Sequence, residues 1–127
     1  MVVISFGNLI AVGVGAAIGA WLRLGLGVWL NQTHPALPLG TLTANILGGL
    51  LVGLSVGMLD RFPSLDPIWR MAIVTGFLGA LTTFSTFSLE AINLLSRGQI
   101  GWLLGHSALH LFGSIAAAAI GLRLASA

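Results

Sequence analysis

The stretch from Gly76 to Glu90, GFLGALTTFSTFSLE, is apolar enough for a membrane segment yet carries side chains that could surround an ion. Hydroxyl groups alternate with two phenylalanines, Phe84 and Phe87, and belong to Thr82, Thr83, Ser85, Thr86 and Ser88. These residue types are middling helix formers, and the hydroxyls compete for backbone hydrogen bonds, so the sequence predicts a helix break here. In a membrane, freed backbone groups must face protein, water or a bound ion. We therefore expect an ion site along this stretch.

A buried amide is the second candidate. Asn45 lies within the apolar run GTLTANILGG, and leaving its side chain unpaired in lipid would cost several kcal/mol. Its amide could join two helices, or its NH2 group could face a pore and replace water around an anion. Thr41 and Thr43 are weaker candidates because threonine can bond to its own helix.

Three polar residues recur at a spacing of four near the C-terminus: His106, His110 and Ser114. This spacing puts them on one helical face, where they could line a wet path or pack against the hydroxyl-rich segment. Two histidines four residues apart could also bind a metal. However, no carboxylate or other third ligand lies nearby in the sequence, so a metal site is not favoured.

Arg23 and Glu90 are charged residues near the ends of apolar segments. Arg23 could snorkel to the interface, pair with freed carbonyl groups, or attract anions at a vestibule. Glu90 could be an interfacial or packing carboxylate, or could lie at a vestibule.

The composition indicates the elements that must position these residues. The chain is 57% hydrophobic and 6% charged, with a mean hydropathy of +1.04, whereas soluble domains have roughly 25% charged residues. A helix that spans a membrane needs about 20 apolar residues. We expect an all-α, multi-pass protein of the cell membrane, with residues 1–127 forming one domain of four transmembrane helices, at about 3–30, 39–59, 71–95 and 100–122. Polar, proline-containing loops at 31–38 and 60–70 separate the first three.

Several function classes are excluded. The five basic residues are dispersed, so nucleic acid is not an expected partner. The chain has no cysteine, no paired carboxylates, no nucleophile elbow and no phosphate-binding loop, so we do not expect an enzyme. No Lys or Arg precedes the first apolar run, so a cleaved signal peptide is not expected.

The arginines favour neither orientation in the membrane. With four spans, Arg61, Arg70 and Arg123 lie on one side, and Arg97, with Arg23 if it snorkels, lies on the other. Because cytoplasmic Lys and Arg set orientation, the chain should insert both ways up. Four thin helices are also too few to enclose a hydrophilic path. Both arguments predict an antiparallel homodimer in membrane lipid.

Taken together, these features resemble the CrcB or Fluc family of fluoride channels. The resemblance covers nearly the whole chain and is carried by Gly15 to Arg23 (GAAIGAWLR), Gly40 to Gly49 (GTLTANILGG) and above all Gly76 to Glu90.

The resemblance implies a dual-topology dimer with two antiparallel pores that export fluoride from the cytoplasm, and one structural sodium ion at its centre. The sodium would be held by the backbone carbonyls of Gly79 and Thr82. The implied fluoride path consists of Asn45, Phe84, Phe87, Thr83, Ser85, Thr86, Ser88, His110 and Ser114, with Arg23 and Glu90 towards the pore ends. His106 and His110 depart from the pattern, since relatives often have tyrosine and serine there, but a neutral histidine still donates a hydrogen bond.

The alternative function is a small dual-topology, proton-coupled multidrug exporter. Such an antiporter needs a titratable carboxylate in the membrane interior, and Glu90 lies too near the end of its segment for that role.

Overall fold

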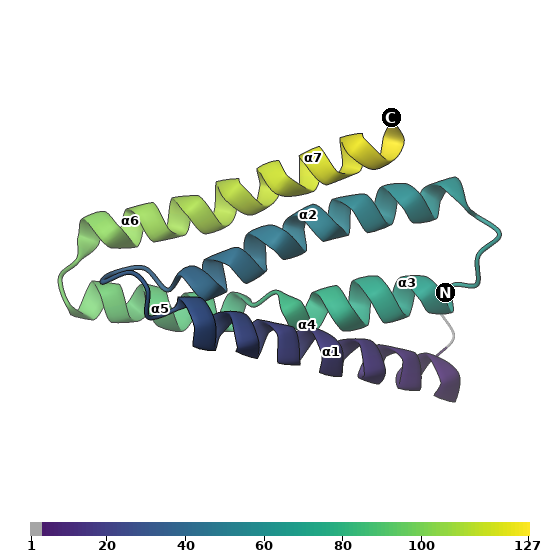
Figure 1. Cartoon of the computed structure of the whole chain (residues 1–127), viewed down its shortest axis with the longest axis horizontal. Coiled ribbons are helices and arrows are strands. Elements are labelled where there is room, and N and C mark those ends of the chain that lie inside the picture. Colours follow the sequence, from purple (N-terminus) through teal and green to yellow (C-terminus); the bar gives the residue numbers. More distant parts are fainter. Residues whose placement is uncertain (1–3) are drawn as a thin grey trace.

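The computed structural model describes residues 4–127. These residues form four long helical segments, here called rods, that alternate in direction (Figure 1). The first rod is α1 (Phe6–Leu30) and the second is α2 (Leu39–Arg61). The third joins α3 (Ile68–Arg70), η1 (Met71–Leu78), α4 (Gly79–Leu81) and α5 (Phe84–Ser96), and the fourth joins α6 (Ile100–Ala108), η2 (Leu109–Gly113) and α7 (Ser114–Ser126). All four rods are long and apolar enough to cross a membrane, so the prediction of four membrane-spanning helices is confirmed.

The predicted boundaries differ from the observed ones mainly around the central loop. Residues 60–70 were expected to form a loop, but α2 continues to Arg61 and the next rod begins at Ile68. The fourth rod extends to Ser126, beyond the expected end at 122. Charged residues do not stop a helix that leaves the membrane, so hydropathy alone ends these helices too early. Residue 3, the expected start of the first span, lies outside the described residues.

Successive rods run in opposite directions, so the first and third rods are parallel to each other, as are the second and fourth (Figure 1). The start of α1 and the end of α7 lie at the same end of the molecule as the α2–α3 connection, and the other two turns lie at the opposite end (Figure 1). The second rod packs along α7, and α1 packs along η1 and α4. Close approach depends on small residues: a Cβ added at Gly19 would lie 3.0 Å from the backbone nitrogen of Leu81, and one at Gly49 would lie 2.6 Å from Ser114 O.

The third rod has extended backbone between α4 and α5. Thr82 has φ and ψ of −86° and 156°, and Thr83 has −151° and 122°. Thr83 is the N-cap of α5, and its hydroxyl oxygen accepts a hydrogen bond of 3.1 Å from the backbone N–H of Thr86. Threonine is a favoured N-cap because its side chain satisfies an N–H group that has no partner within the helix. A new helix therefore starts at Phe84.

Two segments have the wider π-helical winding. They are η1, which leads up to α4, and η2, which contains His110. Segments of π-helix are rare and occur often at functional sites, because the wider turn changes the direction of side chains. Both segments adjoin the region around Thr82 and Thr83.

Candidate functional site

The amide of Asn45 bridges α2 to the extended backbone of the third rod. The backbone N–H of Thr83 donates to Asn45 Oδ1 at 2.7 Å, and Asn45 Nδ2 donates to Thr83 O at 3.0 Å. In an uninterrupted helix this N–H would donate to Gly79 O, four residues earlier. The amide thus satisfies backbone groups that the third rod leaves unpaired. This geometry supports the helix-joining interpretation of Asn45.

The second N–H of Asn45 Nδ2 is directed at a histidine, because Nδ2 lies 2.9 Å from His110 Nδ1. The orientation of the amide is fixed by its paired bonds to Thr83, so Nδ2 is the donor and His110 Nδ1 the acceptor. A neutral imidazole that accepts through Nδ1 carries its hydrogen on Nε2. Both N–H groups of Asn45 therefore have protein partners, and the available donor in this part of the site is His110 Nε2.

Arg23 supports the same region from the opposite side. Its Nε donates a 2.9 Å hydrogen bond to the carbonyl oxygen of Ala80, the middle residue of α4. Of the sequence interpretations of Arg23, pairing with a freed carbonyl is confirmed. The charge therefore lies beside the end of α4, where a cation interacts favourably with the helix dipole.

Four aromatic rings form a continuous group. Phe84 and Phe87 on α5 have ring centroids 5.4 Å apart. Phe87 in turn stacks on His106 at 5.1 Å and lies 4.9 Å from His110. The predicted shared face of the two histidines is confirmed by these contacts. Phe84 is 80% exposed in the single subunit, whereas both histidines are buried.

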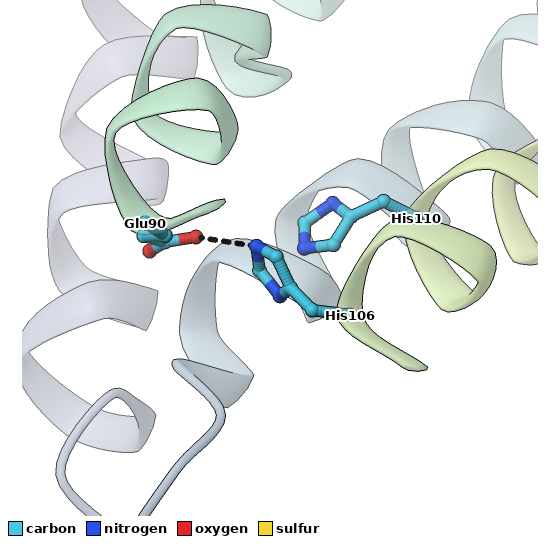
Figure 2. Close-up of side chains that lie close together, drawn as sticks. All are labelled: Glu90, His106 and His110. Atoms are coloured by element: carbon cyan, nitrogen blue, oxygen red, sulfur yellow. Dashed lines mark ion pairs between the residues drawn. The ribbon is translucent and has the colours of Figure 1, made fainter. Parts of the chain in front are cut away.

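Glu90 belongs to this group although it is distant from the histidines in sequence. Its Oε2 accepts a 2.7 Å hydrogen bond from the Thr41 hydroxyl, and its Oε1 lies 3.6 Å from His106 Nε2. Figure 2 shows the carboxylate of Glu90 directed at His106, with His110 beside it. One potential ligand atom from each of these three residues lies within 4.8 Å of the other two. The sequence around the histidines offers no third ligand, but folding supplies one from a distance, because α5 packs against α6 and brings Glu90 beside them.

A cavity of about 450 Å³ lies at the extended segment and joins many of the predicted residues. Its lining includes eight of them: Asn45, Gly79, Thr82, Thr83, Phe84, Phe87, His110 and Ser114. Most of the remaining lining is glycine or aliphatic, so the polar groups are concentrated near Asn45 and Thr83. This combination of apolar walls and a few directed polar groups is typical of ligand sites.

The other predicted residues lie outside that lining. Ser88 is exposed and donates to Phe84 O at 2.8 Å, which is a bond within its own helix. Ser85 is also exposed, and its hydroxyl lies 3.3 Å from that of Thr83. Thr86 contributes its backbone N–H to the cap of α5. The run of hydroxyls is therefore divided between capping, helix bonding and the cavity.

The sequence matches a family model over residues 10–122, described as CrcB-like protein, Camphor Resistance (CrcB). The chain belongs to the CrcB family.

Curated relatives match this CrcB chain over most of its length and most of their own. One from Cupriavidus pinatubonensis is 59% identical over 115 residues, which is 91% of both chains. One from Pseudomonas putida strain W619 is 52% identical over 115 residues, again 91% of both. One from Aromatoleum aromaticum is 52% identical over 112 residues, or 88% of this chain and 86% of the relative. All three relatives are named fluoride-specific ion channel FluC.

These findings define the class of the CrcB chain. It is a multi-pass membrane protein of a channel family and not an enzyme. The similarity to CrcB suggested by the sequence motifs is confirmed. The exporter alternative gains no support from these relatives.

Proposed function

We propose that this protein is a passive, fluoride-selective channel that lets fluoride leave the cytoplasm down its electrochemical gradient. The observation that carries the proposal is the cavity at Thr82 and Thr83, bordered by Asn45, His110 and the phenylalanine rings, in a chain whose relatives are named fluoride-specific channels.

Fluoride is small and strongly hydrated, so a pore must replace its water with good hydrogen-bond donors. His110 Nε2–H is buried and has no partner among residues 4–127. Asn45 selects this tautomer by donating to Nδ1. In the proposal, Asn45 positions Thr83 and His110, and fluoride meets the imidazole N–H together with nearby hydroxyls such as those of Thr83 and Ser114. Neutral donors hold the anion weakly enough to release it.

Phe84 and Phe87 form the apolar side of the proposed path, which excludes water from around the ion. An aromatic ring carries positive charge at its edge and negative charge on its faces. Phe84 and Phe87 could therefore present ring edges to fluoride while excluding bulk water. The ring of Phe87 is restrained by His106 and His110, which fixes its orientation. Ser85, Thr86 and Ser88 continue the proposed path on α5, and Arg23 and Glu90 lie towards its ends.

The conducting unit in this proposal is an antiparallel homodimer embedded in lipid. Its support is the nearly even division of arginines between the two sides and the 80% exposure of Phe84 in the single subunit. A ring meant to line a narrow path needs a second wall, which an inverted copy of the chain can supply.

A structural sodium ion fits the extended segment. Gly79 and Thr82 offer backbone carbonyl oxygens, which are hard ligands suited to a hard cation. The N–H that would normally reach Gly79 O donates to Asn45 instead, and Gly79 is exposed on the subunit surface. The ion would fix the two extended segments against each other across the dimer axis. Its role in the proposal is structural, and fluoride does not bind it.

Reconstitution into liposomes tests the function directly. We expect fluoride efflux, followed with an ion-selective electrode, and no comparable chloride efflux. Fluoride efflux equal to that of empty liposomes would contradict the channel proposal.

Orientation can be tested separately because the natural chain has no cysteine. An impermeant maleimide should label part of a Ser126→Cys variant in intact cells, from the outer face, and the remainder only after the cells are permeabilised, from the inner face. Labelling from one face only would contradict dual topology.

A further inference from the structure

Three potential metal ligands converge from three different elements. Glu90 comes from α5, His106 from α6 and His110 from η2 (Figure 2). Both histidines are buried, and the Glu90 side chain is 12% exposed. Two imidazoles and one carboxylate form a ligand set that suits divalent transition metals, whereas sodium, magnesium and calcium prefer oxygen ligands.

Glu90 Oε1 and His106 Nε2 face each other but form no hydrogen bond with each other. Within residues 4–127, Glu90 Oε1 and His106 Nε2 have no hydrogen-bond partner. In the neutral tautomer of His106 whose hydrogen is on Nδ1, Nε2 offers a lone pair. In that tautomer two acceptors face each other at 3.6 Å. That separation is too long for one shared hydrogen bond but close to the roughly 3.3 Å between two ligands of a tetrahedral ion with bonds of about 2.0–2.1 Å.

We propose that Glu90, His106 and His110 form a binding site for a divalent transition-metal ion, and that Zn²⁺ fits it best. The outer contacts already orient two of the ligands. Thr41 donates to Glu90 Oε2 and leaves Oε1 for the metal, and the Phe87 ring stacks on the His106 ring. Such outer hydrogen bonds fix the ligand atom and raise affinity. Small side-chain shifts bring the three ligand atoms from within 4.8 Å of each other to bonding distance.

Coordination by His110 conflicts with its bond to Asn45. If Nδ1 binds the metal, it can no longer accept from Asn45 Nδ2. If Nε2 binds the metal, the ring hydrogen moves to Nδ1, which then no longer accepts. Metal binding and the Asn45–His110 hydrogen bond therefore exclude each other. A bound cation would also hold fluoride too tightly for release. This second consequence, inhibition of flux, depends on the proposed channel function, whereas metal binding does not.

Metal binding is tested on the purified protein in detergent, with Co²⁺ absorption as the spectroscopic probe and Zn²⁺ calorimetry for affinity. Glu90→Gln removes the anionic ligand, and His106→Phe removes an imidazole while keeping a ring beside Phe87. The matched control is His34→Asn, because an Asn oxygen can replace His34 Nδ1, which accepts from Ala36 and Leu37 in the α1–α2 loop. We expect each site variant to lose at least about tenfold in affinity and the control to bind as wild type.

Absence of Co²⁺ and Zn²⁺ binding to wild type would overturn the site. Equal affinity in Glu90→Gln and His106→Phe, both eluting as wild type on gel filtration, would do so as well. Fluoride efflux is then measured without Zn²⁺ and with Zn²⁺ present on both faces of the liposomes. The ratio of the two efflux rates is compared between the proteins. Zinc should slow fluoride efflux through wild type and through His34→Asn by at least about tenfold. It should slow efflux through Glu90→Gln much less. Zinc that binds without slowing efflux would overturn the competition with Asn45, while failure of metal-free efflux would affect only the proposed function.

Discussion

Asn45 and Thr83 are paired through two hydrogen bonds, in which the side-chain amide of one residue satisfies both the backbone N–H and the backbone carbonyl of the other. The pair joins the first half of α2 to the residue that precedes α5. An extended segment inside a membrane needs such a partner, because lipid offers no hydrogen bonds.

Asn45→Asp should abolish most fluoride flux and lower stability. The aspartate keeps an acceptor for Thr83 N–H but removes the donor to Thr83 O and His110 Nδ1. Each unpaired buried group costs roughly 1–3 kcal/mol, and a negative charge repels fluoride. Liposome efflux and thermal unfolding in detergent would measure the two effects. Asn93→Asp, on the exposed face of α5, is the matched control and should retain most flux. Equal behaviour of the two variants would contradict the role of Asn45.

Substitution of either phenylalanine should reduce flux, but the two substitutions should differ in their effect on stability. Phe84→Ile should reduce flux with little change in the stability of the subunit, because Phe84 is 80% exposed there. Phe87→Ile should reduce flux and also lower the melting temperature, because it removes ring contacts with both histidines. Phe112→Ile is the control, since Phe112 lies on η2 and is 66% exposed. Wild-type flux in both α5 variants would mean that the path lies elsewhere.

Arg23→Leu should destabilise the third rod by roughly 1–3 kcal/mol, because it removes a charged donor from the Ala80 carbonyl. The measurement is thermal unfolding of the purified protein. Arg97→Leu makes the same change of charge at an exposed position of the α5–α6 turn and should shift the midpoint much less. If both variants melt alike, the hydrogen bond to Ala80 contributes nothing to stability.

Much of the architecture was predictable because it depends on local patterns. The apolar runs predicted four rods, and the spacing of His106 and His110 predicted a shared face. Gly15 and Gly19 lie four residues apart and so share one helical face, along which α1 approaches η1 and α4 closely. Each of these follows from a period or a length that the sequence displays directly.

The site depended on contacts that no local pattern encodes. Glu90 meets His106 only because the turn after α5 folds α6 back at a particular angle. The amide of Asn45 could have faced a pore, and only tertiary packing directs its donors to Thr83 and His110. One signal was present in the sequence: Glu90, like the histidines, lies near a short turn between neighbouring helices. Residues close to the same hairpin are close in space.

Substitutions at His110 separate its hydrogen bonds from its packing. His110→Phe keeps a ring against Phe87 but can neither accept from Asn45 nor donate to fluoride, so flux should fall at least about tenfold, the scale of one lost hydrogen bond. His110→Ser loses the ring contact but keeps an acceptor and a donor, and it should therefore conduct better than the phenylalanine variant despite lower stability. Efflux and melting temperature measured on the same preparations decide between the two roles. If His110→Phe conducts as well as wild type, or His110→Ser conducts worse than His110→Phe, the imidazole acts in packing and not as a donor on the path.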